Sequence, residues 1–117
     1  MKFKMNIVTL LSVLIALIPF GIYSSYYSHM PEVIPIHYNF QGEADRFVSK
    51  YNYQVLLILA LGFIGLIITK ILGKIIVHLY AAEQKDKHKS TKKIMDVTAF
   101  FITILFVGIS IYFITAI

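Results

Sequence analysis

VLLILALGFIGLIIT, at residues 55–69, is the stretch of sequence that decides the fold. Together with the mixed segment that follows it, this run is long enough for a helix to cross the roughly 30 Å hydrocarbon core of a bilayer. Similar runs lie within residues 6–23 and 94–117. Hydrophobic residues make up 58% of the 117 and charged residues only 15%, which is too apolar for a soluble domain. The sequence therefore predicts one all-α membrane domain, residues 1–117, with three transmembrane helices over about 6–23, 54–82 and 94–117.

Lysines indicate how the three spans are oriented. Five lysines lie within residues 83–93, and Lys2 and Lys4 precede the first span. Cytoplasmic segments carry an excess of Lys and Arg, and two crossings separate these two groups. We therefore expect the N-terminus and a loop at 83–93 inside, and the C-terminus and a loop at 24–53 outside. The tyrosines that flank the outer loop are typical of an aromatic belt at the membrane interface: Tyr26, Tyr27, Tyr51 and Tyr53.

The first span is long for a signal peptide, and the second is long for a membrane helix. Residues 6–23 can also be interpreted as a cleaved signal peptide, but the run exceeds the ~7–15 residues of a signal core and no small-residue cleavage site follows. A helix over 54–82 would be about 43 Å long at ~1.5 Å per residue, so we expect its inner end to protrude from the bilayer.

Small residues predict the faces through which the helices pack. In lipid, helices associate where small side chains let their backbones approach. The face on the second span consists of Gly62, Gly65, Thr69 and Gly73. The faces on the other two consist of Thr9, Ser12, Ala16 and Pro19, and of Asp96, Ala99, Thr103 and Ser110. We expect a three-helix bundle kinked at Pro19. The alternative is that these faces form a seam between copies of a homo-oligomer or toward a partner.

Charged residues near the inner ends favour an ion pair and contact with lipid. Lys70 and Lys74 recur beside the glycine face, and Asp96 begins the third span at similar depth. We expect a structural ion pair of Asp96 with Lys70 or Lys74, with a proton or ion relay as the alternative. The lysine-rich loop at 83–93 should attract anionic lipid headgroups or a cytoplasmic regulator. No nucleic-acid-binding module accompanies the lysines, so no nucleic acid partner is expected.

IPIHYNFQGEADRF, at residues 34–47, is the polar part of the outer loop. Pro31 and Pro35 disfavour helix just before them, so we expect extended backbone over residues 30–35, and Asn39 and Gly42 favour a turn. Two interpretations remain open, and both can hold. In the first, polar residues lock the fold of the loop: Asn39 and Asp45 bond to nearby backbone, His37 acts as a cap and Gly42 takes a positive φ. In the second, an apolar surface binds a peptide or protein through Ile34, Ile36, Tyr38, Phe40 and Phe47.

The spacing of these residues resembles a known family. Pro31, Ile34-Pro35-x-His37-Tyr38-Asn39-x-x-Gly42-x-x-Asp45 and Ser49-Lys50, followed by an apolar helix, are similar to domain-of-unknown-function family 1648. The resemblance extends over roughly residues 10–69, with Ala44 where the family usually has Pro and Phe47 where Trp is common. This domain is best known from the N-terminal part of SdpI-type bacterial immunity proteins, which protect a producer cell from its own secreted peptide toxin.

The resemblance implies a multi-pass protein of the bacterial cell membrane that confers immunity to a peptide toxin. The toxin would bind at the outer face, through Ile34, Pro35, His37, Tyr38, Asn39, Phe40, Gly42, Asp45 and Phe47. SdpI-type proteins have further spans. An accessory or stabilising subunit of a larger envelope complex, such as a transporter or sensor, is therefore the alternative function.

Catalytic and metal chemistry receive little support from the residues. The sequence has no cysteine, which excludes thiolate metal sites and cysteine nucleophiles. His29, Glu32, His37, Glu43 and Asp45 share the outer loop, but their spacing matches no zinc-protease motif. No serine lies in an activated context. We expect no enzymatic activity, no metal site and no cofactor.

Overall fold

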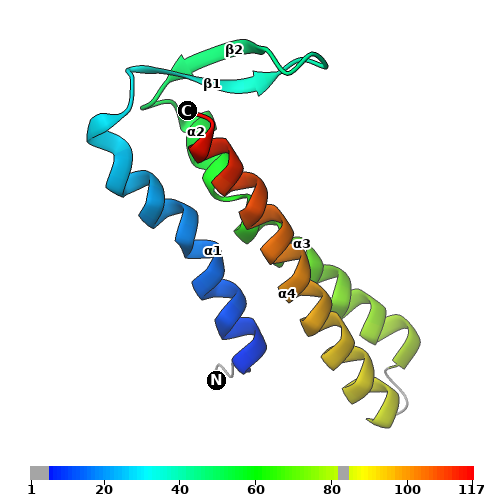
Figure 1. Ribbon diagram of the computed structural model, residues 1–117. Helices are drawn as coiled ribbons and strands as arrows, with labels where there is room; N and C mark the ends of the chain where they lie inside the picture. The colour runs from blue at the N-terminus through cyan, green and yellow to red at the C-terminus, as the bar shows by residue number, and fades with distance from the viewer. Residues whose placement is uncertain (1–5, 82–84) are drawn as a thin grey trace.

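Three long apolar helices form the body of the protein in the computed structural model, which describes residues 6–81 and 85–117 (Figure 1). The first is α1 (Ile7–Tyr26), which continues as a 3-10 turn, η1 (Tyr27–His29). The second consists of α2 (Tyr53–Leu59), α3 (Leu61–Ile76) and a π-helical end, η2 (Val77–Ala81), and the third is α4 (Lys85–Thr115). The prediction of a mostly helical membrane fold with three spans is confirmed.

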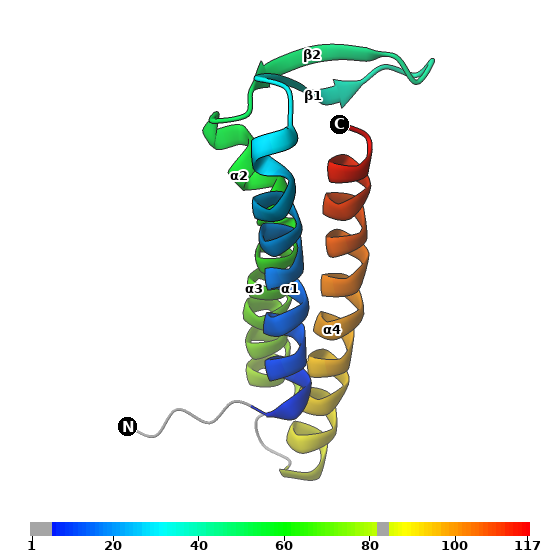
Figure 2. The same cartoon turned by 60° about the vertical axis from the view of Figure 1, so that its left-hand side comes forward.

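A two-stranded antiparallel sheet connects the first two helices. It is a hairpin of β1 (Val33–Tyr38) and β2 (Ala44–Ser49). Seen from two directions, the hairpin lies across one end of the bundle together with the C-terminus, and α1 starts at the opposite end (Figures 1 and 2). The extended backbone expected after Pro31 is therefore one strand of a hairpin that caps the helices.

The second helix differs from the continuous helix expected over 54–82. It is interrupted at Ala60, whose φ of −87° and ψ of 4° depart from helical values. Carbonyl groups in the last turn of a helix lack their usual partners, and lipid cannot supply one. Ser110 of α4 donates a hydrogen bond of 2.6 Å to the carbonyl of Ile58, one such group. The break is thus stabilised by a bond from the neighbouring helix.

The lysine-rich segment is helical where it is described, so the expectation of a loop over 83–93 is wrong from Lys85 onward. Residues 82–84 lie outside the described residues. Lysine is a good helix former and this segment contains no Pro or Gly, so nothing in it ends a helix. The third helix consequently begins at Lys85, before the expected start at residue 94.

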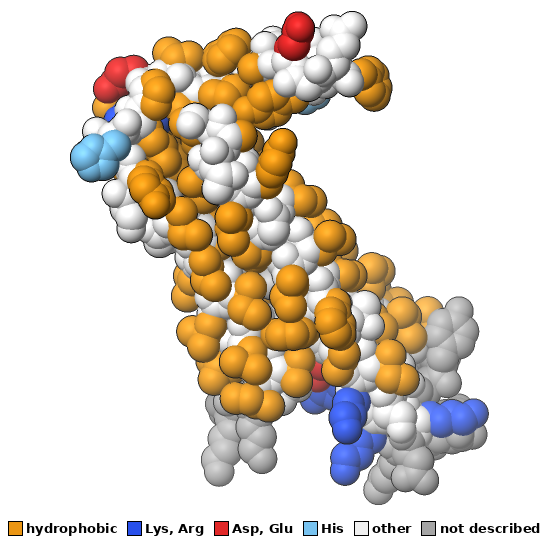
Figure 3. All heavy atoms as spheres, viewed as in Figure 1, with side chains coloured by type: hydrophobic (Ala, Val, Ile, Leu, Met, Phe, Trp, Pro, Cys, Tyr) orange, Lys and Arg blue, Asp and Glu red, His pale blue; other side chains and the backbone are white. Residues whose placement is uncertain are grey.

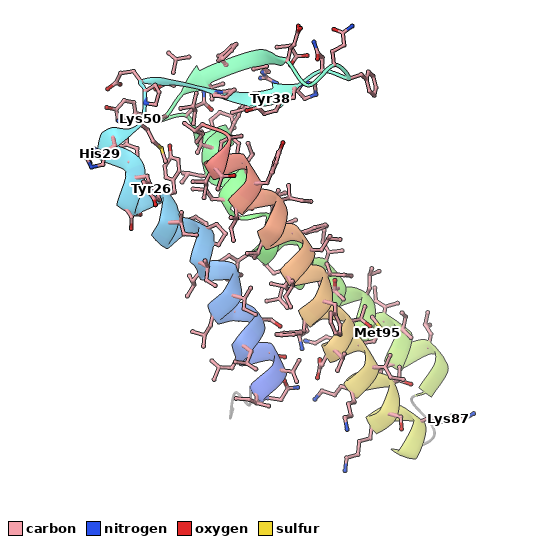
Figure 4. The ribbon with its side chains drawn as sticks, in the orientation of Figure 1. Tyr26, His29, Tyr38, Lys50, Lys87 and Met95 are labelled. Carbon is pink, nitrogen blue, oxygen red and sulfur yellow. The ribbon has the colours of Figure 1, made fainter. Side chains whose placement is uncertain are left out.

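The glycines of α3 allow close contact with its neighbours. A Cβ atom added at Gly62 would lie 2.7 Å from Val107 Cγ2, and one added at Gly65 would lie 2.7 Å from Phe106 Cε2. One added at Gly73 would lie 3.1 Å from the Cβ of Met95, a residue of α4 marked in Figure 4. Thr69 is buried on the same face. These residues place α3 directly against α4.

The other two small-residue faces also point into the bundle. Ser12, Ala16 and Pro19 of α1 are buried, and Pro19 lies within the helix without ending it. On α4 the buried residues include Asp96, Ala99, Thr103 and Ser110. The structure therefore uses the faces predicted from the sequence as contacts between helices.

Candidate functional site

The hairpin turn is held by the side chain of Asn39. Its Oδ1 accepts hydrogen bonds from the backbone N–H groups of Gln41 (2.9 Å) and Glu43 (3.0 Å). Gly42 has a φ of +80°, a conformation that other residues rarely adopt. Asn39 and Gly42 thus stabilise the turn, in agreement with the first interpretation of the loop.

His37 and Asp45 join the two strands. His37 Nδ1 lies 2.6 Å from Asp45 Oδ1, and the side chains are 65% and 42% exposed. The strand register shifts on either side of His37, where extra residues bulge out of the pairing. We expected Asp45 to bond to nearby backbone and His37 to act as a cap. The described hydrogen bonds instead pair these two side chains with each other.

The hairpin docks on the helices through one apolar face. Ile34 is completely buried and Val48, its partner across the strands, is half-buried. They pack in a cluster at the end of the bundle that also contains Tyr23, Val55, Leu59, Phe113 and Ile114. The expectation that Ile34 contacts a ligand is therefore wrong, because burial against the helix ends removes its side chain from the surface. Ile36 is half-buried beside the same cluster.

Lys50 fastens the end of the hairpin to the end of α1. Its ammonium donates to the backbone carbonyls of Tyr27 (2.9 Å) and Met30 (3.4 Å) and lies 4.4 Å from the centre of the Tyr27 ring. The Lys50 carbonyl in turn accepts a bond of 2.8 Å from the Tyr23 hydroxyl. Figure 4 shows Lys50 where the chain leaves the hairpin, near the end of α1.

Sequence reasoning did not assign Lys50 a role. It ends the Ser49-Lys50 part of the family pattern, and Tyr51 follows it. Few lysines are expected on the outer side of the membrane, and an aromatic ring at the interface can bind an ammonium group. An outer lysine directly before a tyrosine is therefore the sequence signal for a buried role of Lys50. Lys50 is only 7% exposed and is therefore a buried residue.

The opposite face of the hairpin presents apolar side chains to solvent. Neighbouring positions along a strand point to opposite faces. Val33, Pro35 and Phe47 therefore point away from the bundle, because they flank Ile34 and Val48 in the pairing. Val33 and Phe47 are more than half exposed and Pro35 is half-buried. We call these three residues the outward patch.

The remaining predicted ligand residues lie toward the tip of the hairpin. Tyr38 and Asn39 are half-buried, whereas Phe40 and Gly42 are exposed. Figure 4 marks Tyr38 near the end of β1. The structure thus divides the predicted set among four places: the outward patch, the tip, the His37–Asp45 pair between the strands, and, for Ile34, the core.

A polar cluster joins all three helices at the other end of the bundle. Asp96 of α4, 7% exposed, accepts hydrogen bonds from the ammonium of Lys70 and from Asn6 Nδ2 (2.5 Å). Lys70 also donates to Thr9 Oγ1 (2.6 Å). Lys74 is exposed, and within residues 6–81 and 85–117 it is Lys70 that pairs with Asp96. A buried carboxylate needs compensating donors, and Lys70 and Asn6 supply them to Asp96.

The described residues contain no group of three or more His, Asp or Glu side chains placed to hold a metal ion. The one histidine–carboxylate contact of the hairpin, between His37 and Asp45, supplies two groups at most. A catalytic zinc site takes three protein ligands.

Comparison with protein families finds a match that includes the whole hairpin. Residues 14–63 match the family described as Domain of unknown function (DUF1648). In comparisons with curated proteins and with solved structures, nothing matches the chain. The matched segment runs from α1 through the hairpin and α2 into α3 and contains the pattern from Pro31 to Lys50. Over residues 14–63, the chain is therefore similar to the family described as Domain of unknown function (DUF1648).

Proposed function

We propose that this protein confers immunity on a bacterial cell by binding a secreted peptide toxin at the outer face of the cell membrane. The observation that carries the proposal is the fixed outward patch. Ile34 and Lys50 attach the hairpin to the helices, so Val33 and Phe47 stay exposed, beside the half-buried Pro35, on a fixed support. Preorganised apolar side chains bind a partner at a low cost in conformational entropy.

The edge of β2 supplies the second part of the binding site. A two-stranded sheet leaves one edge of each strand without a neighbouring strand, and an extended peptide can add to such an edge through backbone hydrogen bonds. Pro35 removes one N–H group from β1, whereas β2 contains no proline and is mostly exposed. We therefore assign the toxin backbone to β2 and its apolar side chains to the outward patch.

This assignment needs no catalytic group, cofactor or metal ion. The toxin is held away from the membrane or from its target, and the binding energy comes from strand addition and apolar contact.

The test is protection of a sensitive strain. Cells that express the wild-type chain are challenged with a panel of purified peptide toxins, and the inhibitory concentration is compared with that of cells carrying the empty vector. The double variant Val33→Ala with Phe47→Ala should lose protection. Phe101→Ala, which truncates another exposed phenylalanine, on α4, should keep it. Membrane abundance of each variant is measured alongside.

Two results contradict the proposal. The first is unchanged killing by every toxin when the wild-type chain is present in the membrane. The second is full protection by the double variant.

One observation favours an accessory subunit as a second candidate function. A Cβ atom at Gly108 of α4 would meet nothing within 4 Å, and Phe101, Leu105 and Tyr112 on the same helix are exposed. A gap of this kind lets a helix of another membrane protein approach. A partner that co-purifies in mild detergent with the wild type and is lost with Gly108→Leu would support this candidate, and a chain that purifies alone would count against it.

Lipid is the partner proposed for the lysine-bearing end of α4. Lys87, Lys89, Lys92 and Lys93 are exposed there, and Figure 3 shows lysines gathered at that end of the molecule. Each lysine near an anionic membrane surface contributes about 1 kcal/mol of binding.

A further inference from the structure

The tip of the hairpin carries the most exposed large apolar side chain of the described residues. Phe40 has a relative exposure of 112%, as high as in an extended chain. The turn that presents it is rigid, because Asn39 Oδ1 accepts from two backbone N–H groups within it. The exposure of Phe40 is thus a fixed property of the fold.

The tip extends sideways beyond the bundle. Two views that differ by 60° both show the turn projecting past the end of α4 (Figures 1 and 2). The space-filling view shows a hollow between the overhanging tip and the side of the helices (Figure 3). In a membrane, lipid surrounds the bundle, so the tip overhangs lipid.

Exposed tyrosines indicate the depth of the membrane surface at this end. Tyr26, Tyr51, Tyr53 and Tyr112 are each more than half exposed. They lie at the ends of α1, α2 and α4 next to the hairpin. Such a ring is typical of the level where headgroups meet acyl chains. The hairpin runs across the bundle just beyond this level.

We propose that Phe40 inserts into the interfacial region of the lipid leaflet beneath the tip. The hairpin is then held at two points, by Ile34 on the helices and by Phe40 in the lipid. Aromatic side chains on a polar backbone segment favour this region. The inference does not depend on the proposed function, which uses the outward patch.

The surroundings of Phe40 favour lipid over a protein partner. The other residues of the turn are Asn39, Gln41, Gly42 and Glu43. A binding hot spot in a protein interface needs apolar neighbours that exclude water around the central side chain, and the turn supplies none. Polar side chains around a single aromatic ring suit lipid headgroups instead.

The absence of tryptophan from the sequence makes the test direct. Phe40→Trp and Phe47→Trp are each purified and placed in bilayers made with or without lipids brominated near the headgroup end of the acyl chains. Bromine quenches tryptophan fluorescence on contact. The Phe40→Trp protein should emit at shorter wavelength and lose about half of its emission to brominated lipid, since interfacial side chains reach ~5–10 Å into this boundary. Phe47→Trp, on the outward patch, should show emission typical of water and no quenching.

Two results overturn the inference. Unquenched emission typical of water from Phe40→Trp places the tip in solvent. Emission at short wavelength without bromine quenching places the tip against protein, either a second copy of the chain or another partner. As a second measurement, a spin label on Phe40→Cys should be more accessible to oxygen than to a water-soluble nickel complex; the reverse order also overturns the inference.

Discussion

Single residues at the two ends of the bundle connect elements that lie far apart in the sequence. Lys50 joins the hairpin to η1, and Asp96 joins α4 to Lys70 of α3 and to Asn6, which caps α1. Both residues are charged and only 7% exposed. A buried charge is tolerated where donors or acceptors compensate it, so each should be sensitive to loss of its partner.

Replacing Lys50 with methionine tests the contact between hairpin and α1. Methionine keeps a similar apolar stem but cannot donate to the carbonyls of Tyr27 and Met30, which lose a charged partner. The free energy of local opening should fall by about 1–3 kcal/mol. Hydrogen exchange of the β1 and β2 amides measures this loss.

Arg46→Met is the matched control for this experiment, because Arg46 is exposed on β2. It should leave exchange nearly unchanged. Equal protection of the hairpin in the two variants would show that Lys50 contributes nothing to docking.

The Lys70–Asp96 pair is tested by removing one or both charges. Lys70→Met leaves a buried carboxylate without its cation and should lower the free energy of unfolding by about 3 kcal/mol. The double variant Lys70→Met with Asp96→Leu should recover part of this loss, because two apolar side chains need no partner. The free energies of unfolding of the wild type and the two variants are measured by adding denaturing detergent to the proteins in mixed micelles.

The same pair also distinguishes a structural role from an ion relay. Asp96→Asn keeps a hydrogen-bonding side chain and should retain protection if the pair is structural. Lost protection at unchanged folded yield would favour the relay.

At the scale of helices and strands, local pattern predicted the helix faces but not the hairpin. The spacing of Gly62, Gly65, Thr69 and Gly73 reflects helical geometry within one segment, so it can be read from the sequence. Pairing of β1 with β2 depends on bulges around His37, which no local spacing fixes. Ile34 illustrates the consequence, since whether it points toward the helices or toward solvent depends on that register.

The break at Ala60 was missed for a similar reason. Alanine is the strongest helix former, and the bond that compensates the break comes from Ser110, 52 positions after Ile58. Lys50 is another such case, because the carbonyls that it contacts belong to residues 20 and 23 positions earlier.

Two glycines on different helices test the packing between α3 and α4. Gly65→Ala places a methyl group against the ring of Phe106 and should lower the free energy of unfolding by about 1–3 kcal/mol. Gly108→Ala adds the same methyl group in open space and should be neutral or stabilising by up to ~1 kcal/mol through helix propensity. Unfolding in mixed micelles measures both variants, and equal effects would contradict the packing described for α3.

For the molecule as a whole, the proposed toxin binding depends on which side of the membrane the hairpin faces. The hairpin and the exposed lysines of α4 lie at opposite ends of the bundle (Figures 1 and 3). The positive-inside rule assigns the lysines to the cytoplasm, and the hairpin must then face outward. Binding of a secreted toxin requires this orientation.

The sequence has no cysteine, so single cysteines introduced into it report this orientation without background. Gln41→Cys places a thiol at the hairpin tip, and Lys89→Cys places one near the start of α4. Intact cells are treated with a maleimide that cannot cross the membrane, before and after permeabilisation. We predict that Gln41→Cys is labelled in intact cells and Lys89→Cys only after permeabilisation; the opposite pattern would contradict an outward-facing hairpin.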